Sequence, residues 1–224
     1  MYINIKKWTI ILPQESSNLI QVEQKNPFET SKVKRKLNTK DCRILFLYPN
    51  ERGMSTIPPS ITSLSQILKD EGHQTALFDT TFYKFDDEIS IEDSEVTKSK
   101  SLENRPVLER DDDDIHFKKT TRSAILDFEA SIENFKPDFI AVSCTETTFL
   151  RAIKLIKKTR HKNIKNLFGG VFPTFAPDLV MNYKDVDMIC VGEGENAIID
   201  LANSISNNED YSNVTNLWIR QNDG

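Results

Sequence analysis

Five short apolar runs recur along the chain, and stretches with apolar residues at helical spacing separate them. The runs are Ile44–Tyr48, Thr75–Phe78, Phe139–Val142, Ile164–Phe168 and Met188–Val191. A continuous apolar run such as Ile44–Tyr48 is typical of a strand that is buried on both faces, as in a parallel sheet. The alternation therefore predicts an α/β fold, a doubly wound, flavodoxin- or Rossmann-like parallel sheet of five strands. An edge strand at Trp8–Leu12 and a last short strand at Asn216–Ile219 are also expected.

The carboxyl ends of these strands are expected to lie along one edge of the sheet, because parallel strands are joined by right-handed crossovers. Ligands of open α/β sheets bind outside this edge. The segments that would meet there are Pro49–Ile57, Asp79–Tyr83, Ser143–Thr148, Gly169–Thr174 and Gly192–Glu195. This edge is therefore the predicted ligand site.

Two glycine-bearing turns follow successive runs at this edge. Gly169 and Gly170 are adjacent, and Gly192 and Gly194 belong to the next turn. Glycine lets a ligand approach the backbone where a Cβ atom would block it. Two such turns predict one large ligand lying across the strand ends. On this interpretation Gly170→Val should weaken ligand binding strongly and leave the fold mostly intact.

The polar side chains expected at this edge are mostly uncharged. Hydroxyl groups come from Ser143, Thr145, Thr147, Thr148 and Thr174, and carboxylates only from Asp79, Glu146, Glu193 and Glu195. The chain has neither a GxGxxG pattern nor a Walker A pattern, so a dinucleotide or a nucleoside triphosphate is not favoured. Hydroxyl groups and backbone amides suit a large neutral ligand with many amide groups better than a phosphate with several charges.

The acidic charge of the chain is concentrated in one segment. Lys84–Thr121 holds twelve acidic and seven basic residues, which account for the whole formal net charge of −5. Within it, Asp86–Thr120 shows little apolar periodicity, which predicts a mostly disordered insertion that can be deleted without loss of binding or of cooperative melting. No broad basic surface remains, so nucleic acid is not an expected partner.

The cysteines Cys42, Cys144 and Cys190 lie far apart, with no CxxC or CxxxCxxC grouping. This spacing argues against a zinc site or an iron–sulfur cluster in the chain and favours small buried residues in a reducing compartment. No apolar run reaches 18 residues, so no membrane span is expected, and we predict a cytoplasmic protein. No histidine falls at the predicted edge, so a histidine-ligated metal is not expected there.

Several short motifs follow one another in a distinctive order. They are Pro58-Pro59-Ser60, Leu77-Phe78-Asp79, Val142-Ser143, Gly169-Gly170-Val171-Phe172-Pro173-Thr174 and Val191-Gly192-Glu193-Gly194-Glu195. This order resembles the cobalamin-binding domain that precedes the catalytic barrel in cobalamin-dependent radical SAM enzymes. The resemblance places this domain at residues 42–224 and leaves residues 1–41 as an N-terminal extension or linker.

The chain departs from the motifs of methionine-synthase-type cobalamin domains, which carry DxHxxG, then SxL, then GG. Thr81 stands where the cobalt-ligating histidine would be, and Lys84 replaces the glycine. The second motif reads Ser143-Cys144-Thr145. Radical SAM relatives commonly lack that histidine as well, so the resemblance implies no cobalt ligand from a protein side chain.

Carried over to matching positions, the resemblance implies a set of cofactor-binding residues. Gly169 and Gly170 would flank the nucleotide tail of cobalamin, with Val171, Phe172, Pro173 and Thr174 beside it. Ser143, Cys144, Thr145 and Glu146 would hydrogen-bond the tail or the corrin amides. Gly192, Glu193, Gly194 and Glu195 would border the same cleft. Pro58, Pro59 and Ser60 would begin the helix under the corrin, and Asp79 and Thr81 hold the positions of the first motif.

The resemblance also implies a function. The chain would bind cobalamin and present it to a radical SAM barrel, in cis or in trans, for methyl transfer or a related radical reaction. S-adenosylmethionine and a 4Fe-4S cluster would belong to that barrel, whose cysteine motif does not occur before Gly224. We therefore expect no turnover by this chain alone, which would be a fragment or a stand-alone carrier.

Two other functions stay open at this point. A hydrolase or transferase could use Ser143, Glu146 or Glu193 in the cleft, although no pair of base and nucleophile is visible. A stand-alone flavodoxin-like ligand-binding or regulatory domain is supported by the fold class alone.

Overall fold

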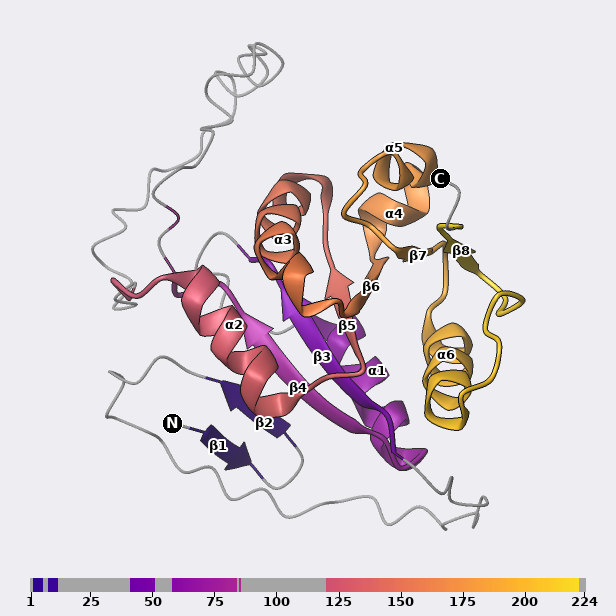
Figure 1. The fold of residues 1–224 in the computed structure, drawn as a ribbon, viewed down its shortest axis with the longest axis horizontal. Coiled ribbons are helices and arrows are strands. Elements are labelled where there is room, and N and C mark those ends of the chain that lie inside the picture. The colour runs from indigo at the N-terminus through magenta and orange to yellow at the C-terminus, as the bar shows by residue number, and fades with distance from the viewer. Residues whose placement is uncertain are drawn as a thin grey trace, which may run out of the picture.

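The computed structural model describes residues 2–5, 8–11, 41–50, 58–83, 85 and 120–221 (Figure 1). Its strands are β1 (Tyr2–Ile5), β2 (Trp8–Ile11), β3 (Arg43–Tyr48), β4 (Gln74–Asp79), β5 (Phe139–Ser143), β6 (Lys165–Gly169), β7 (Met188–Cys190) and β8 (Leu217–Ile219). Its helices are α1 (Pro59–Asp70), α2 (Ala124–Phe135), α3 (Glu146–Thr159), α4 (Val171–Phe175), α5 (Pro177–Met181) and α6 (Glu195–Asn207), and a 3-10 turn, Arg160–Lys162, follows α3. The five predicted apolar runs correspond to β3 to β7.

The sheet confirms the α/β fold class but is larger than predicted. Its strand order is β1-β2-β4-β3-β5-β6-β7-β8. The five strands β4, β3, β5, β6 and β7 pair in parallel, in the order of flavodoxin-like folds. With β8, which pairs antiparallel to β7, they form a six-stranded, mostly parallel sheet. The pair β1 and β2 then extends the edge beyond β4, so the five-stranded count was too small.

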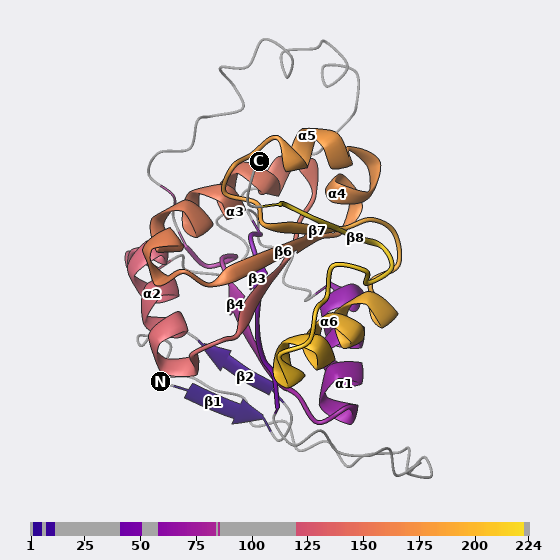
Figure 2. The ribbon, with the colours of Figure 1, turned by 45° about the vertical axis from the view of Figure 1, so that its right-hand side comes forward.

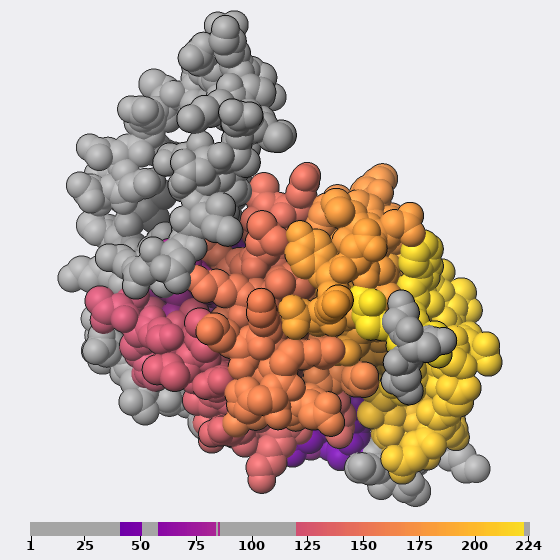
Figure 3. Space-filling model, turned by 45° about the horizontal axis from the view of Figure 1, so that its top comes forward, coloured from indigo at the N-terminus to yellow at the C-terminus, as the bar shows by residue number. Residues whose placement is uncertain are grey.

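Helices cover both faces of the sheet, and the sheet separates the apolar core into two layers (Figures 1 and 2). On one face α2 and α3 pack around Phe78, Phe128, Phe149 and Phe168. On the other face α1 and α6 pack around Phe46, Phe139, Ile61 and Leu201. In the space-filling view the orange residues from α3 to α5 lie between α2 and the yellow C-terminal segment (Figure 3). These two apolar layers hold the carboxyl ends of the strands in place.

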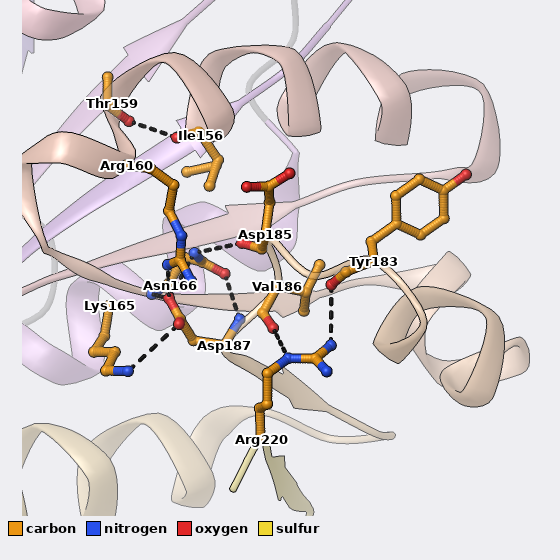
Figure 4. A network of polar contacts seen from close by, with 10 residues as sticks. All are labelled: Ile156, Thr159, Arg160, Lys165, Asn166, Tyr183, Asp185, Val186, Asp187 and Arg220. Carbon is orange, nitrogen blue, oxygen red and sulfur yellow. Dashed lines mark hydrogen bonds and ion pairs between the residues drawn. The ribbon is translucent and has the colours of Figure 1, made fainter. Parts of the chain in front are cut away.

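A polar network fixes β6 and β7 at their amino ends, away from the predicted site (Figure 4). The Asp187 carboxylate is 4% exposed and accepts hydrogen bonds from Asn166 N at 3.0 Å, Asn166 Nδ2 at 2.8 Å and Arg160 Nη1 at 2.7 Å. In return Asp187 N donates to Asn166 Oδ1 at 3.0 Å. Arg220, just after β8, donates to the carbonyl oxygens of Val186 and Tyr183. The network joins the last three strands to the loop after α5.

Residues on either side of the acidic segment are joined. Tyr83 and Thr120 form an isolated parallel bridge, and Thr120 N donates to the Phe82 carbonyl oxygen at 2.7 Å. The Tyr83 hydroxyl donates to Asp127 Oδ2 in α2 at 2.9 Å, and Arg122 pairs with the same carboxylate. The predicted insertion lies outside the described residues except for Thr120, which belongs to this bridge.

Candidate functional site

A narrow cavity of about 160 Å³ lies between the sheet and helices α1 and α6. Its floor is made by Phe46, Ala141, Leu167 and Cys190, which point from four neighbouring strands toward the α1 and α6 face. Leu64 from α1 and Ile198 from α6 form its walls. At the strand ends it is lined by Ser60, Val142, Ser143, Gly169, Gly170, Gly192, Glu193, Gly194 and Glu195. The cavity is therefore apolar inside and polar at its mouth.

A wider cleft of about 780 Å³ lies along the carboxyl ends of the strands. It is lined by Tyr48, Asn50, Pro58, Ser60, Ser143, Cys144, Thr145, Thr147, Thr148, Gly170, Val171, Thr174, Phe175, Gly192 and Glu193. Five of these residues also line the cavity: Ser60, Ser143, Gly170, Gly192 and Glu193. The cleft and the cavity are thus two parts of one site.

The topology explains why the site lies here. The chain leaves β3 toward β4 on one side and later returns to β5 on the other, so β3 and β5 flank the switch point of the sheet. Side chains from the connecting loops diverge at such a point and leave a crevice. Next to it, Ser143 at the end of β5 pairs with Gly169 at the end of β6. The small residues at these two ends keep the crevice open.

Gly170 is required by its own turn rather than by a ligand. Its φ is +101°, which L-residues rarely adopt, and a Cβ atom there would lie 2.7 Å from the Cys144 carbonyl oxygen. The expectation that Gly170→Val leaves the fold mostly intact is therefore wrong, because the added atoms would meet backbone.

Gly169 and Gly194 differ from Gly170, because each could carry a Cβ atom in ordinary contact. At Gly169 the nearest atoms would be Val142 O at 3.9 Å and Cys190 Cβ at 4.0 Å. At Gly194 they would be Cys190 Sγ and Leu64 Cδ2, both at 3.8 Å. Both glycines line the narrow cavity. A larger side chain at either position would occupy cavity volume.

Thr174 connects the two glycine turns. Its hydroxyl donates to the Gly170 carbonyl oxygen at 2.9 Å and accepts from the Gly192 backbone N–H at 3.1 Å. A single side chain of α4 therefore sets the spacing between the turns that follow β6 and β7. Thr174 in the motif Gly169–Thr174 therefore has a structural role, because its hydroxyl bonds to both turns.

Hydroxyl groups gather at the start of α3. Thr145 and Thr148 form a capping box, in which Thr145 N donates to Thr148 Oγ1 at 3.0 Å. Thr147 Oγ1 lies 3.0 Å from Thr145 Oγ1. All three threonines line the cleft. With the N–H groups of the first helical turn, they offer this wall of the cleft several donors and acceptors.

The thiols at the site are held in their neutral form. Burial raises the pKa of the Cys144 thiol to about 12. Burial, with help from Glu195 and Glu193, raises the pKa of the Cys190 thiol to about 11. Within the part of the chain that the structure describes, no group of three or more His, Cys, Asp or Glu residues could hold a metal ion. At pH 7 both thiols are therefore uncharged.

The structure brings together thirteen of the predicted site residues in the lining of the cavity or the cleft. They are Pro58, Ser60, Ser143, Cys144, Thr145, Gly169, Gly170, Val171, Thr174, Gly192, Glu193, Gly194 and Glu195. The lining does not include Pro59, Asp79, Thr81, Glu146, Phe172 or Pro173. Phe172 instead packs on Phe149, with ring centroids 5.1 Å apart. Asp79 and Thr81 bind each other instead, since the backbone N–H and the hydroxyl of Thr81 both donate to Asp79 Oδ1.

Other lining residues were not singled out from the sequence. Leu64 and Ile198 have the helical spacing of ordinary core residues, and helical periodicity cannot distinguish a packed core from a cavity wall. Tyr48 and Asn50 follow from their position at the end of β3, which was the available signal. Phe175 is 83% exposed at the rim of the cleft, at the end of α4.

Comparisons with known proteins show what this chain is similar to. A family model described as B12 binding domain matches residues 107–202. The structure of the radical S-adenosylmethionine methyltransferase TsrM from Kitasatospora setae, with cobalamin and a 4Fe-4S cluster bound, has a TM-score of 0.58 and 17% identity, over 82% of this chain and 30% of that one.

The cobalamin-dependent S-adenosylmethionine radical enzyme OxsB, with aqua-cobalamin bound, has a TM-score of 0.52 and 15% identity, over 82% of this chain and 21% of that one. This chain therefore spans less than a third of the length of either structure. At these identities the likeness concerns the fold. No curated protein is significantly similar in sequence. No helix among the described residues is long and apolar enough to cross a membrane.

Proposed function

We propose that this chain holds cobalamin across the cavity and the cleft described above. A family model described as B12 binding domain matches residues 107–202, and the fold resembles that of cobalamin-dependent radical SAM enzymes, which supports the proposal. The observation that carries this proposal is the continuity of the two spaces. A narrow apolar cavity opens at two glycine turns into a wider cleft, whose lining includes several hydroxyl groups. Such a shape suits a ligand with a flat macrocycle and a flexible tail that ends in an aromatic base.

The cavity is the part that fits the nucleotide tail. Its floor and walls are apolar, as an aromatic base requires, and Ser60 and Ser143 place hydroxyl groups at its mouth. Gly169 and Gly194 leave room that a side chain would fill. These residues would bind the tail and exclude water from it.

The cleft is the part that fits the corrin. The amide side chains around a corrin ring both donate and accept hydrogen bonds, and so do the three threonines at the start of α3. Cobalamin, when bound, supplies a cobalt centre that can carry a methyl group. The residues of this chain would bind and orient the ring, and none of the described residues that line the cleft or the cavity is a histidine.

We further propose that the domain presents its cofactor to a radical SAM catalytic domain, in cis or in trans, for methyl transfer or a related radical reaction. Two observations support this role. TsrM is described as a radical S-adenosylmethionine methyltransferase with cobalamin bound. In this chain Val171 and Phe175, 60% and 83% exposed, lie one helical turn apart at the rim of the cleft. S-adenosylmethionine and the cluster would belong to the partner domain.

The test is a titration of the purified chain with hydroxocobalamin, followed by gel filtration. We expect corrinoid to co-elute with the protein at micromolar concentration. Gly194→Val should fill the cavity and raise the Kd for cobalamin at least tenfold. Asn196→Val, on the exposed side of the same helical turn, is the matched control and should bind as the wild type does. Failure of the wild-type chain to retain corrinoid would refute the proposal.

A corrinoid that lacks the nucleotide tail tests the proposed roles of the cavity and the cleft independently. Dicyanocobinamide keeps the corrin ring but lacks the nucleotide. Gly194→Val should therefore leave its Kd within about twofold of the wild-type value, whereas the Kd for cobalamin rises. An equal loss for both ligands would place the tail elsewhere.

A further inference from the structure

We propose that the narrow cavity selects corrinoids by the base at the end of their tail, and that it favours a benzimidazole over a purine. This inference rests on the proposed function, because it assigns the cavity to the nucleotide tail of a corrinoid. Corrinoids share one ring but differ in this base, so a domain that holds the tail can discriminate among them. The discrimination would come from the chemistry of the residues that line the cavity.

Among the described residues, those that form the floor and the walls of the cavity have no side-chain nitrogen or oxygen. They are Phe46, Leu64, Ala141, Leu167, Cys190 and Ile198, and all six belong to the apolar layer on the α1 and α6 face. The Cys190 thiol is their one weakly polar group, and it donates to the Glu193 carbonyl oxygen at 3.8 Å. A base inside the cavity would therefore meet apolar side chains.

The backbone around the cavity adds no partner at its floor. Phe46 pairs with Ala141, and Ala141 pairs with Leu167, in the parallel register of the sheet. The hydrogen bonds of a sheet run between neighbouring strands, whereas the cavity lies on the face of the sheet. On the helix side, Ile198 N donates to the Gly194 carbonyl oxygen at 2.9 Å. The backbone groups under the floor are therefore already paired and do not point into the cavity.

The volume of the cavity suits an aromatic ring. It is about 160 Å³, and Gly169 and Gly194 leave this space free of side chains. An apolar cavity of about 150 Å³ lined by Leu, Ile and Phe stays dry and takes up benzene. Because such a space does not hold water, a polar group of the base cannot find a bridging water there either. The polar groups of a purine would remain unpaired inside it.

The two classes of base differ in these polar groups. Dimethylbenzimidazole, the base of cobalamin, carries two methyl groups and one ring nitrogen besides the one that bears the ribose. Adenine carries three further ring nitrogens and an exocyclic amine. Burying polar groups without partners lowers affinity by about ten- to hundredfold, while methyl groups gain from apolar contact. The lining therefore favours cobalamin over a corrinoid with a purine base.

The experiment measures the Kd of the full chain for corrinoids that differ only in the tail. The probes are cobalamin, pseudocobalamin (which carries adenine), p-cresolyl cobamide and cobinamide, all in the dicyano form, in which cyanide displaces the base from cobalt. Cobalamin should bind at least about tenfold more tightly than pseudocobalamin. The p-cresolyl cobamide, whose base is apolar and has no ring nitrogen, should also bind more tightly than pseudocobalamin although its ring is smaller.

A polar side chain in the cavity should relax this preference. Leu64→Asn places an amide on the wall from α1 and should reduce the ratio of the pseudocobalamin Kd to the cobalamin Kd by about fivefold or more. Ile67→Asn is the matched control, because Ile67 is also partly buried against the same apolar layer but lines neither the cavity nor the cleft. Its ratio should equal that of the wild type.

The outcomes separate this inference from the proposed function. Equal Kd values for cobalamin and pseudocobalamin, or a p-cresolyl cobamide that binds no more tightly than pseudocobalamin, would overturn the inference while the proposed function stands. An equal change of the ratio in Leu64→Asn and Ile67→Asn would overturn it as well. Failure of the wild-type chain to bind any of the four corrinoids would overturn both. Melting curves show whether each variant is folded, and Ala141→Ser, which adds a hydroxyl to the floor, provides the readout should Leu64→Asn not fold.

Discussion

Gly170 and Cys144 approach so closely that a Cβ atom on the glycine would lie 2.7 Å from the Cys144 carbonyl oxygen. This contact joins the ends of β6 and β5, where Cys144 N also donates to the Gly169 carbonyl oxygen at 3.1 Å. The glycine pair therefore contains two positions with different roles. Gly170 makes the turn possible, and Gly169 leaves the cavity open.

The two roles can be separated by alanine. Gly170→Ala should lower the free energy of unfolding by about 3 kcal/mol, because the positive φ and the backbone contact both oppose a side chain. Gly169→Ala should change it by less than about 1 kcal/mol, since its Cβ atom would be in ordinary contact. Urea unfolding followed by circular dichroism measures both. Equal losses would show that the contact does not restrict Gly170.

The reciprocal pairing of Asn166 and Asp187 predicts a second stability effect. Asp187→Ala should lower the free energy of unfolding by about 3 kcal/mol, because it leaves buried N–H groups of Asn166 without an acceptor. Asp185→Ala, two residues earlier, is the control and should cost less than about 1 kcal/mol. Corrinoid affinity should not change at a temperature where both variants are folded, since the network lies at the opposite end of the strands. A loss of affinity without a loss of stability would contradict this separation.

The Asp79 carboxyl group predicts a dependence of stability on pH. Burial raises its pKa above the ordinary value of 3.8, against the opposing effect of the hydrogen bonds from Thr81. Because the pKa of this group is higher in the native state than in the unfolded state, the group contributes stability that is fully present below pH 3.8. That contribution is lost as the pH rises through the native pKa. Asp79→Asn, which stays neutral and can still accept from Thr81, should therefore be more stable than the wild type at pH 7.

Thermal melting at pH 7 and at pH 3.5 tests this sign. The advantage of Asp79→Asn should shrink toward zero at the lower pH, where most of the wild-type carboxyl groups are protonated in both states. A variant that is less stable than the wild type at pH 7 would show that the ionised group stabilises the native state.

The bridge between Tyr83 and Thr120 sets the limits of a deletion. Replacing residues 86–119 with a short Gly-Ser linker should preserve corrinoid binding and a single cooperative melting transition, because Thr120 and its partners remain. Deleting residues 86–120, the boundary expected from the sequence, removes the bond from Thr120 N to Phe82 O and should lower the melting temperature. Tyr83→Phe should cost about 1 kcal/mol through loss of the bond to Asp127. Loss of binding in the shorter deletion would assign a binding role to the removed segment.

Much of the fold could be predicted from the sequence because its central strands are buried on both faces. β3 to β7 are short runs of apolar residues, and a run of that kind leaves few alternatives. The extra strands carry a weaker signal, since an edge strand of three or four residues is held by one neighbour. β8 was expected from Asn216–Ile219, whereas β1 depends on its pairing with β2 and was missed.

The site was predictable to the extent that it follows from strand ends. Glycines and hydroxyls after β5, β6 and β7 mark the edge without any knowledge of distances. The cavity behind them is different, because Leu64 and Ile198 have the pattern of ordinary core residues. The role of Gly170 also depended on a backbone contact with Cys144, and the hydrogen bond from the Asn50 side chain to Thr81 joins residues 31 positions apart.

The scarcity of charge at the site has a consequence for how a ligand would be held. Among the described residues that line the cavity and the cleft, Glu193 and Glu195 alone carry a charge. Affinity that comes from shape, apolar burial and neutral hydrogen bonds responds little to screening by ions, unlike affinity from charge pairs. The Kd for a corrinoid should therefore be nearly the same in dilute buffer and in about 0.5 M salt.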